Sequence, residues 1–254
     1  MRILIVGGSG QIGRHLVRDL SGMTAAGEQV IATYHHHPIE GGVPLDITDT
    51  ELLAERIPAM RPDAVIWLAG SKDVGRLERE PAFSEAINET PIRRLLDILH
   101  TMPVAPRLIY LSTDYVYCGR HGQYRDDDMR QPGTVYGRSK LAAESMILDS
   151  GLDAVVLRTS AVMSSHAGFL AWLLGELKNG RQVSLFSNAT FSPTPPIHLS
   201  RALHFLLNAP FSRCSLNFAG PAVTRYDMGR RACEAFGLPV ELVRETEMDF
   251  SSGT

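Results

Sequence analysis

Short apolar runs alternate with amphipathic stretches up to about residue 160, and this alternation constrains the fold more than any other feature. β-Branched runs that are too short for helices favour buried strands, and strands that alternate with helices favour right-handed crossovers. The pattern therefore predicts an α/β fold with a doubly wound parallel sheet that helices cover on both faces. The expected strands are residues 2–6, 29–34, 64–69, 107–112 and 154–157, and the expected helices follow Ile12, run from Asp49 to Ile57, and cover 82–101 and 136–150.

The pattern loosens after about residue 160. Residues 161–254 are expected to form a small lobe whose elements interleave with the main sheet. From about Glu245 the chain is polar, which is typical of a frayed end. Helical spacing recurs over 167–178, 198–208 and 226–236, short strands are expected at 182–186 and 215–218, and a loop rich in Pro, Ser and Thr covers 188–196.

Composition excludes several classes of function. The chain has 254 residues, is 44% hydrophobic and carries a formal net charge of -3. This is enough apolar material for a large α/β domain, with no basic excess to attract nucleic acid or a membrane surface. No apolar run approaches a membrane span and no leader pattern is visible, so we expect a cytoplasmic protein. Three widely spaced cysteines suit a reducing compartment better than a disulfide framework or a zinc site.

A glycine-rich loop follows the first expected strand and opens the first expected helix. The sequence GGSGQIG places Gly7, Gly10 and Gly13 in a G-x-x-G-x-x-G spacing. Small residues let the backbone turn sharply and approach a pyrophosphate, and the helix N-terminus supplies unpaired N–H groups. An ordinary strand–helix turn is the alternative, but the position between these two elements favours a cofactor. Residues 1–160 are therefore expected to form an NAD(P)-binding Rossmann domain, with Gln11, Ile12 and Arg14 also at the cofactor.

The end of the second strand indicates which dinucleotide is bound. A site that prefers NAD usually offers a carboxylate to the ribose there, whereas this strand ends in TYHHH without an acid. Arg14 follows the last glycine and is placed to approach a 2′-phosphate, so NADP(H) is favoured and NAD(H) stays the alternative. Tyr34 and His35 are then expected along the cofactor. Asp46-Ile47 suits an adenine contact or, equally, a polar helix entry. Three adjacent histidines cannot readily converge on one ion, so no metal site is expected.

Tyr136 and Lys140 stand four residues apart in the stretch YGRSK and would share one face of a helix. A tyrosine pKa of about 10 is too high for proton transfer at neutral pH. A unit charge at ~4 Å is worth ~4 kcal/mol at an effective dielectric of about 20, which lowers the pKa by up to roughly three units. We therefore expect Lys140 to lower the pKa of Tyr136 and to permit acid/base catalysis near neutral pH. The alternative is a helix-surface pair, which is what most pairs with this spacing are.

A third polar side chain falls at the end of the fourth expected strand. In LSTDYVY, Thr113 closes the buried run, and ligands of open parallel sheets bind at the carboxyl ends of the strands. Its hydroxyl is placed to hold a reacting oxygen beside Tyr136. The alternative is a hydroxyl that satisfies the local backbone.

Together these residues resemble the extended short-chain dehydrogenase/reductase superfamily, and within it the dTDP-4-dehydrorhamnose reductase-like, sugar-nucleotide-binding family. The resemblance covers nearly the whole chain, in the right order. It implies a Rossmann fold with a small C-terminal substrate-binding lobe. It rests on the stretches GGSGQIG, YLSTDYVYCG, PGTVYGRSKLAAE, LRTS, FSPTPPIHLSRAL and LNFAGPAVTRYDM.

The resemblance also implies roles for individual residues. Thr113, Tyr136 and Lys140 would be catalytic, and Lys140 would also bond the nicotinamide ribose. The implied reaction is hydride transfer to the carbonyl of a keto sugar nucleotide, with Tyr136 as the proton donor. A homodimer is an option that rests on the resemblance alone. Three strand-end residues would lie along the cofactor: Leu68, Ala69 and Gly70.

Several positions depart from the family pattern. Ala161 stands where members often have a tryptophan that contacts the sugar, and residues 71–75 lack the usual pairing of valine with aspartate. His198-Leu199-Ser200 stands where relatives tend to be acidic. These departures leave the substrate open. Two other functions stay open as well: a non-catalytic NADP-binding regulatory subunit, and a sugar-nucleotide epimerase or dehydratase.

Overall fold

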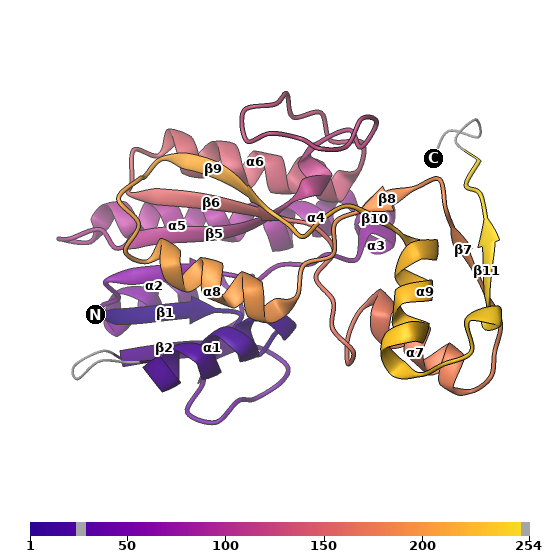
Figure 1. Cartoon of the computed structure of the whole chain (residues 1–254). Coiled ribbons are helices and arrows are strands. Elements are labelled where there is room, and N and C mark those ends of the chain that lie inside the picture. The colour runs from indigo at the N-terminus through magenta and orange to yellow at the C-terminus, as the bar shows by residue number, and fades with distance from the viewer. Residues whose placement is uncertain (24–28, 250–254) are drawn as a thin grey trace. The chain divides into compact units, whose positions relative to one another are not determined.

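The computed structural model of the chain describes residues 1–23 and 29–249 and divides it into two compact units (Figure 1). Unit 1 is Met1–Thr159 with Ile197–Phe218, and unit 2 is Ser160–Pro196 with Ala219–Thr254. Unit 1 therefore includes a late segment of the chain, which carries most of helix α8 (Pro196–Leu206) and strand β9 (Cys214–Phe218).

A seven-stranded sheet forms the centre of unit 1, in the order β3-β2-β1-β4-β5-β6-β9. Every neighbouring pair is parallel, which confirms the predicted doubly wound α/β fold. The strand order reverses between β1 and β4, and ligands of open sheets bind outside the carboxyl ends of the strands at such a point. The strands before β9 are β1 (Arg2–Val6), β2 (Gln29–Tyr34), β3 (Val43–Pro44), β4 (Ala64–Trp67), β5 (Arg107–Thr113) and β6 (Ala154–Thr159).

Helices cover both faces of this sheet (Figure 1). Helix α1 (Gln11–Met23) lies on one face with α8, where Ser200 Oγ donates to Asp19 Oδ2 at 2.7 Å. The other face carries α2 (Thr50–Met60), α5 (Thr90–Thr101) and α6 (Val135–Asp149). Asp49 caps α2 by accepting from Leu52 N, as its position before an apolar run predicts.

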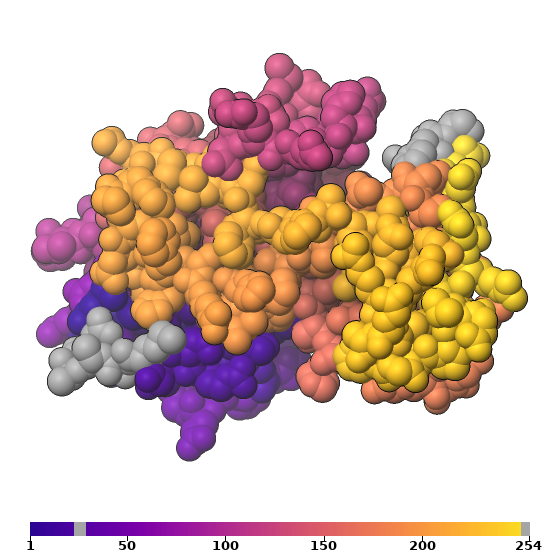
Figure 2. Space-filling view, viewed as in Figure 1, coloured from indigo at the N-terminus to yellow at the C-terminus, as the bar shows by residue number. Residues whose placement is uncertain are grey.

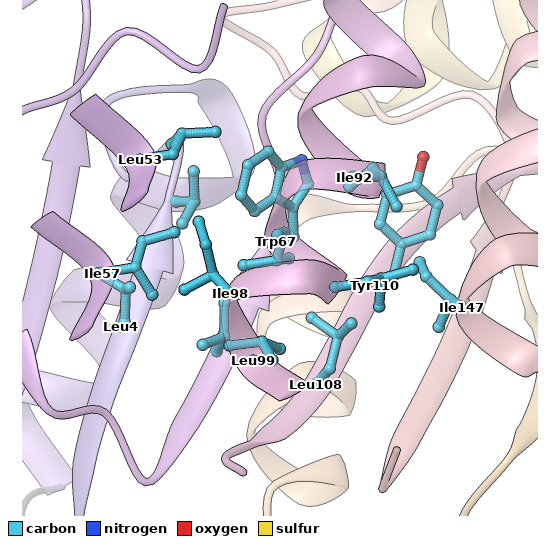
Figure 3. Close-up of a cluster of buried hydrophobic side chains, with 14 of the residues drawn as sticks. Leu4, Leu53, Ile57, Trp67, Ile92, Ile98, Leu99, Leu108, Tyr110 and Ile147 are labelled. Atoms are coloured by element: carbon cyan, nitrogen blue, oxygen red, sulfur yellow. The ribbon is translucent and has the colours of Figure 1, made fainter. Parts of the chain in front are cut away.

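The larger core lies between the sheet and the layer of α2, α5 and α6 (Figure 3). Trp67 of β4 and Tyr110 of β5 are each 1% exposed and lie among Ile57, Ile92 and Ile147 from the three helices. Burial of a large apolar side chain stabilises the fold by roughly 1.5–3 kcal/mol. The core therefore holds β4 and β5, and with them the polar residues that follow these strands.

Unit 2 is built on two small sheets. Strand β7 (Val183–Phe186) pairs in parallel with β11 (Val243–Thr246), and β8 (Thr190–Phe191) pairs antiparallel with β10 (Val223–Thr224). Helices α7 (Phe169–Lys178) and α9 (Arg225–Phe236) contribute to a second core around Leu173, Leu185 and Ala232. A short 3-10 helix, η2 (Val240–Leu242), leads into β11.

Three expected elements differ from the structure. The single helix expected over 82–101 is divided into α4 (Pro81–Asn88) and α5, and a short α3 (Val74–Arg79) precedes them. The break precedes Pro91, which lacks a backbone N–H and therefore favours the first turn of a new helix over the interior of a continuous one. The stretch from Glu245 does not fray at once, because β11 pairs with β7 as far as Thr246. The loop expected over 188–196 contains β8, and residues 250–254 lie outside the described part.

Within residues 1–23 and 29–249, no helix is both long and apolar enough to span a membrane. No three side chains of His, Cys, Asp or Glu in the same ranges come together as metal ligands.

Candidate active site

At the junction of β1 and α1, a side chain on Gly7 or on Gly13 would collide with neighbouring backbone. Gly7 has a φ of +90°, and a Cβ there would lie 2.9 Å from Ala69 N. A Cβ on Gly13 would overlap the carbonyl oxygen of Gly7. Gly10 N donates to that same oxygen at 3.1 Å and closes the turn. The glycines therefore allow the loop to lie directly against the residues that follow β4.

Further contacts hold this loop and leave donors for a ligand. Thr33 Oγ1 of β2 accepts from Gly7 N at 3.2 Å, and Arg14 Nε donates to Ser9 O at 2.8 Å. The first N–H groups of a helix have no partner within it, and Gln11 Nε2 is buried without a hydrogen-bond partner. A loop of small residues with spare donors at a helix N-terminus fits the phosphates of a dinucleotide.

The end of β2 lies beside the loop that contains Asp46. His35 Nε2 is 3.4 Å from Asp46 Oδ2, and Asp46 Oδ1 accepts from Thr48 N at 2.9 Å. Burial raises the pKa of Asp46, but the bonds from Thr48 and the nearby His35 and His36 outweigh it and hold the pKa below its usual value. Ile47 is only 8% exposed and packs in the core, so only its backbone is available for an adenine contact.

The turn after β4, which contains Leu68, Ala69 and Gly70, is tied to helix α6 by Asn88. Asn88 Oδ1 accepts from Ser71 N at 2.9 Å, and its Nδ2 donates to Ser71 O at 3.1 Å and to Ser139 Oγ at 3.2 Å. Gly70 has a φ of +144°, and a Cβ there would lie 2.7 Å from Asn88 Oδ1. Asn88 was not predicted from the sequence, because a single asparagine at a helix end forms no recognisable pattern.

Thr113 and Tyr136 come together as the sequence predicts. Thr113 is 6% exposed at the end of β5, and a side-chain hydrogen bond links it to Tyr136 in the first turn of α6. The Tyr115 ring, in the 3-10 helix η1 (Asp114–Val116), meets the Tyr136 ring edge-on at 5.5 Å. A Cβ on Gly137 would overlap Tyr115 O, so Gly137, which the sequence analysis also missed, allows this close approach.

Lys140 is buried beside the same strand. Its Nζ donates to Leu111 O at 2.8 Å and lies 4.0 Å from the centre of the Tyr110 ring. Burial lowers the pKa of Lys140 to about 7, although the Glu144 carboxylate acts in the opposite direction. The Tyr110 phenol is fully buried, which raises its pKa well above the usual value.

The expectation that Lys140 lowers the pKa of Tyr136 is wrong for this arrangement. Burial raises the pKa of Tyr136 to about 12; the Thr113 hydrogen bond lowers it in part, and Asp114 and Tyr115 raise it. The ammonium of Lys140 instead bonds the backbone of β5. Tyr136 therefore keeps its proton at neutral pH, as a proton donor must.

Unit 2 contains a cavity of about 480 Å³ with an aromatic and a cationic wall. Phe169 and Trp172 line it, and Trp172 is 51% exposed. The Arg225 guanidinium also lines it, 4.6 Å from the centre of the Phe169 ring and 5.5 Å from that of Phe191. Aromatic faces stack on bases, and guanidinium groups bind phosphates. None of these residues was predicted from the sequence to belong to a site, although the stretch around Arg225 contributes to the family resemblance.

Known proteins resemble this chain over most of its length. A probable low-salt glycan biosynthesis reductase of Haloferax volcanii is 31% identical over 258 residues, which cover 98% of this chain and 84% of that protein. A dTDP-4-dehydrorhamnose reductase of Mycobacterium tuberculosis is 32% identical over 251 residues, which cover 96% and 78%. The crystal structure of a hypothetical dTDP-4-dehydrorhamnose reductase from Sulfolobus tokodaii matches with a TM-score of 0.88 at 32% identity, covering 98% of this chain and 87% of that one.

The family assignment rests on the whole chain. The model of the RmlD substrate binding domain matches residues 1–250. This match and the relatives confirm the resemblance that the motifs indicated. The chain belongs to the RmlD substrate binding domain family.

Proposed function

We propose that this chain is a reductase of a keto sugar nucleotide that uses NADP(H) in preference to NAD(H), with Tyr136 as the proton donor. The observation that carries the proposal is the hydrogen-bonded pair Thr113 and Tyr136 at the carboxyl end of β5, with Lys140 one helical turn further along α6. The named activity of the Mycobacterium tuberculosis relative supports the substrate class. Solved proteins of this fold contain NADP or NAD.

Each catalytic residue has a task that its surroundings allow. The bound dinucleotide supplies a hydride to the substrate carbonyl carbon. Tyr136 donates its proton to the carbonyl oxygen, and the Thr113 hydroxyl holds that oxygen. A phenol with a pKa of about 12 is a weak acid, but it is a stronger acid than an ordinary alcohol, so the transfer to the product runs downhill. Lys140, in its ammonium form, bonds the ribose hydroxyls.

The remaining residues bind and orient. The donors at the start of α1 hold the phosphates, and Arg14, with no acid at the end of β2, favours the 2′-phosphate of NADP(H). Tyr34, His35 and the Asp46-Ile47 backbone line the adenosine end. The cavity of unit 2 holds the substrate nucleotide, with Arg225 at its diphosphate. The turn with Leu68, Ala69 and Gly70 lies along the cofactor.

The test is turnover of 4-keto sugar nucleotides by the purified chain, followed by NADPH oxidation. Tyr136→Phe removes only the phenolic oxygen and should lower kcat by roughly two to four orders of magnitude. The affinity for NADPH should stay unchanged, which fluorescence titration checks. Near-full turnover by Tyr136→Phe would contradict the role given to Tyr136. NADPH binding without turnover of any such substrate would instead favour a regulatory subunit.

We also propose that the chain acts in the cytoplasm as a homodimer. Its three cysteines are all free thiols, which suits a reducing compartment. In unit 1, α8 and β9 (orange in Figure 2) line an apolar groove with Phe205 65% and Phe211 36% exposed. Asp126 and Arg201 line the same groove, so a two-fold contact could pair opposite charges. The molar mass in solution, by light scattering, tests this, and a monomer at micromolar concentration would contradict it.

A further inference from the structure

A buried ion pair links helix α6 to strand β6. Glu144 is 0% exposed and Arg158 is 1% exposed. Arg158 Nε donates to both carboxylate oxygens of Glu144 at 3.1 Å, and Arg158 Nη2 donates to Glu144 Oε2 at 2.9 Å. Neither residue belongs to the reaction proposed above.

The surroundings of Arg158 favour its charged form. Burial lowers the pKa of Arg158, but the hydrogen bonds and charge of Glu144, together with Tyr117, outweigh it and raise the pKa above its usual value. Arg158 Nη1 also donates to the Tyr117 hydroxyl at 2.7 Å and to Asp126 O at 3.1 Å. A buried carboxylate needs a cation and hydrogen-bond donors as partners, and the Arg158 guanidinium supplies both to Glu144.

Glu144 lies one helical turn after Lys140, on the same face of α6. Tyr136, Lys140 and Glu144 follow one another at four-residue intervals, which places their side chains along one stripe of the helix. The other groups that face Lys140 come from β5: the Tyr110 ring and the Leu111 carbonyl. Glu89 acts on Tyr110, and Asp114 acts on Tyr136. The charge that opposes the effect of burial on Lys140 is that of Glu144.

We propose that Glu144 is a positioning residue whose carboxylate, fixed in place by Arg158, keeps Lys140 in its ammonium form. The proposal rests on the proposed function, since it concerns the group that would bond the cofactor ribose. A purely structural pair would only tie α6 to β6. Its removal would then lower the melting temperature and leave the proton equilibrium of Lys140 unchanged.

The chain allows a direct measurement, because its lysines are only Lys72, Lys140 and Lys178. Lys72 and Lys178 are exposed, so their replacement in K72R/K178R is conservative. In this variant Lys140 is the one remaining lysine and gives the only lysine side-chain signal. In protein with ¹³C-labelled lysine, the side-chain carbon shifts of Lys140 follow its titration by NMR. In this background Lys140 should titrate at a pH of about 7.

The test variant removes both charges at once. E144Q/R158M leaves no buried charge unpaired, and E144M/R158L is a second pair in case the first does not fold. The loss of the carboxylate should shift the Lys140 titration down by about half a unit to one unit. R158K, which keeps the positive charge, should leave the titration in place. R107M/D153N removes the Arg107–Asp153 pair at the other end of β5 and β6 and should also leave it in place.

The activity gives an independent readout. Lys140 loses its proton as the pH rises through its pKa, so kcat/KM should fall above a pH of about 7. In E144Q/R158M this fall should begin at a lower pH. An unshifted Lys140 titration in both double variants would overturn the inference. A shifted titration without any change in the pH dependence of kcat/KM would support it and contradict the role of Lys140 in the proposed reaction.

Discussion

The carboxyl edge of the unit 1 sheet and the cavity of unit 2 are both candidate binding surfaces, but they are built from different parts of the chain. At the edge of the sheet the surface is mainly backbone: Gly7 and Gly13 leave no room for a Cβ, and the start of α1 supplies N–H donors. In unit 2 the surface consists of side chains, with Trp172 and Arg225 at the cavity. A binding surface made of backbone loses affinity when a substitution adds atoms to it, whereas a substitution in a surface made of side chains removes one interaction with the ligand at a time.

The largest effect should follow from an added methyl group on the backbone surface. Gly13→Ala places a Cβ against Gly7 O and 2.7 Å from Gly8 C, so the loop must move. The dissociation constant of NADPH should rise by about 100-fold or more, since overpacking costs roughly 1–3 kcal/mol and misplaces the phosphate donors as well. Fluorescence titration measures this.

Gly22→Ala is the matched control in the same helix. Nothing lies within 4 Å of a Cβ at Gly22, so this variant should bind NADPH normally and gain about 0.5–1 kcal/mol in unfolding free energy. Equal NADPH affinities for the two variants would show that the loop is not a backbone surface for the cofactor.

A smaller effect is expected at the side-chain surface. Arg225→Met removes one guanidinium from the cavity wall, and hydrogen bonds to charged groups are worth about 1.5–3 kcal/mol. The KM for the sugar nucleotide should rise about 10- to 100-fold, while the dissociation constant of NADPH stays unchanged. Steady-state kinetics at saturating NADPH measures the change.

Arg230 lies on the same helix as Arg225, with its guanidinium 5.9 Å from the centre of the Tyr226 ring, and does not line the cavity. Arg230→Met should therefore leave KM unaltered. If Arg225→Met weakened the binding of NADPH rather than that of the sugar nucleotide, the assignment of one ligand to each surface would be wrong.

The smallest effect should come from Arg14, an exposed side chain that we assign to the cofactor surface. Arg14 is exposed and bonds Ser9 O, and exposed ion pairs contribute about 0.2–1 kcal/mol. Arg14→Gln should raise the dissociation constant of NADPH about fivefold at most and leave that of NADH unchanged. Arg18→Gln, one turn further along α1, is the control and should change neither value. An equal loss of affinity for NADPH and for NADH would contradict a contact between Arg14 and the 2′-phosphate.

An active-site residue can be predicted from the sequence when its position depends on neighbouring residues in the chain, and not when it depends on contacts with other elements. Thr113 and Tyr136 could be paired from the sequence, because a strand end and a helix start are both local features. The direction of the Lys140 ammonium could not be predicted in this way. Helical spacing shows which face of α6 carries Lys140, but not which residues of other elements pack against that face, and it is the β5 backbone and the Tyr110 ring that bind the ammonium. Asn88 and Gly137 were missed because their partners lie in other elements.

The sequence by itself determined the alternation of the five main strands with helices up to residue 160 and the place of the glycine loop, and its motifs indicated the family. The alternation and the loop follow from periodicity and turn chemistry, which act over a few neighbouring residues. Only the tertiary structure decided the proton affinities of Tyr136 and Lys140 and the pairing of Glu144 with Arg158. Burial and the charges of distant residues set these quantities, and both arise only when separate elements pack together.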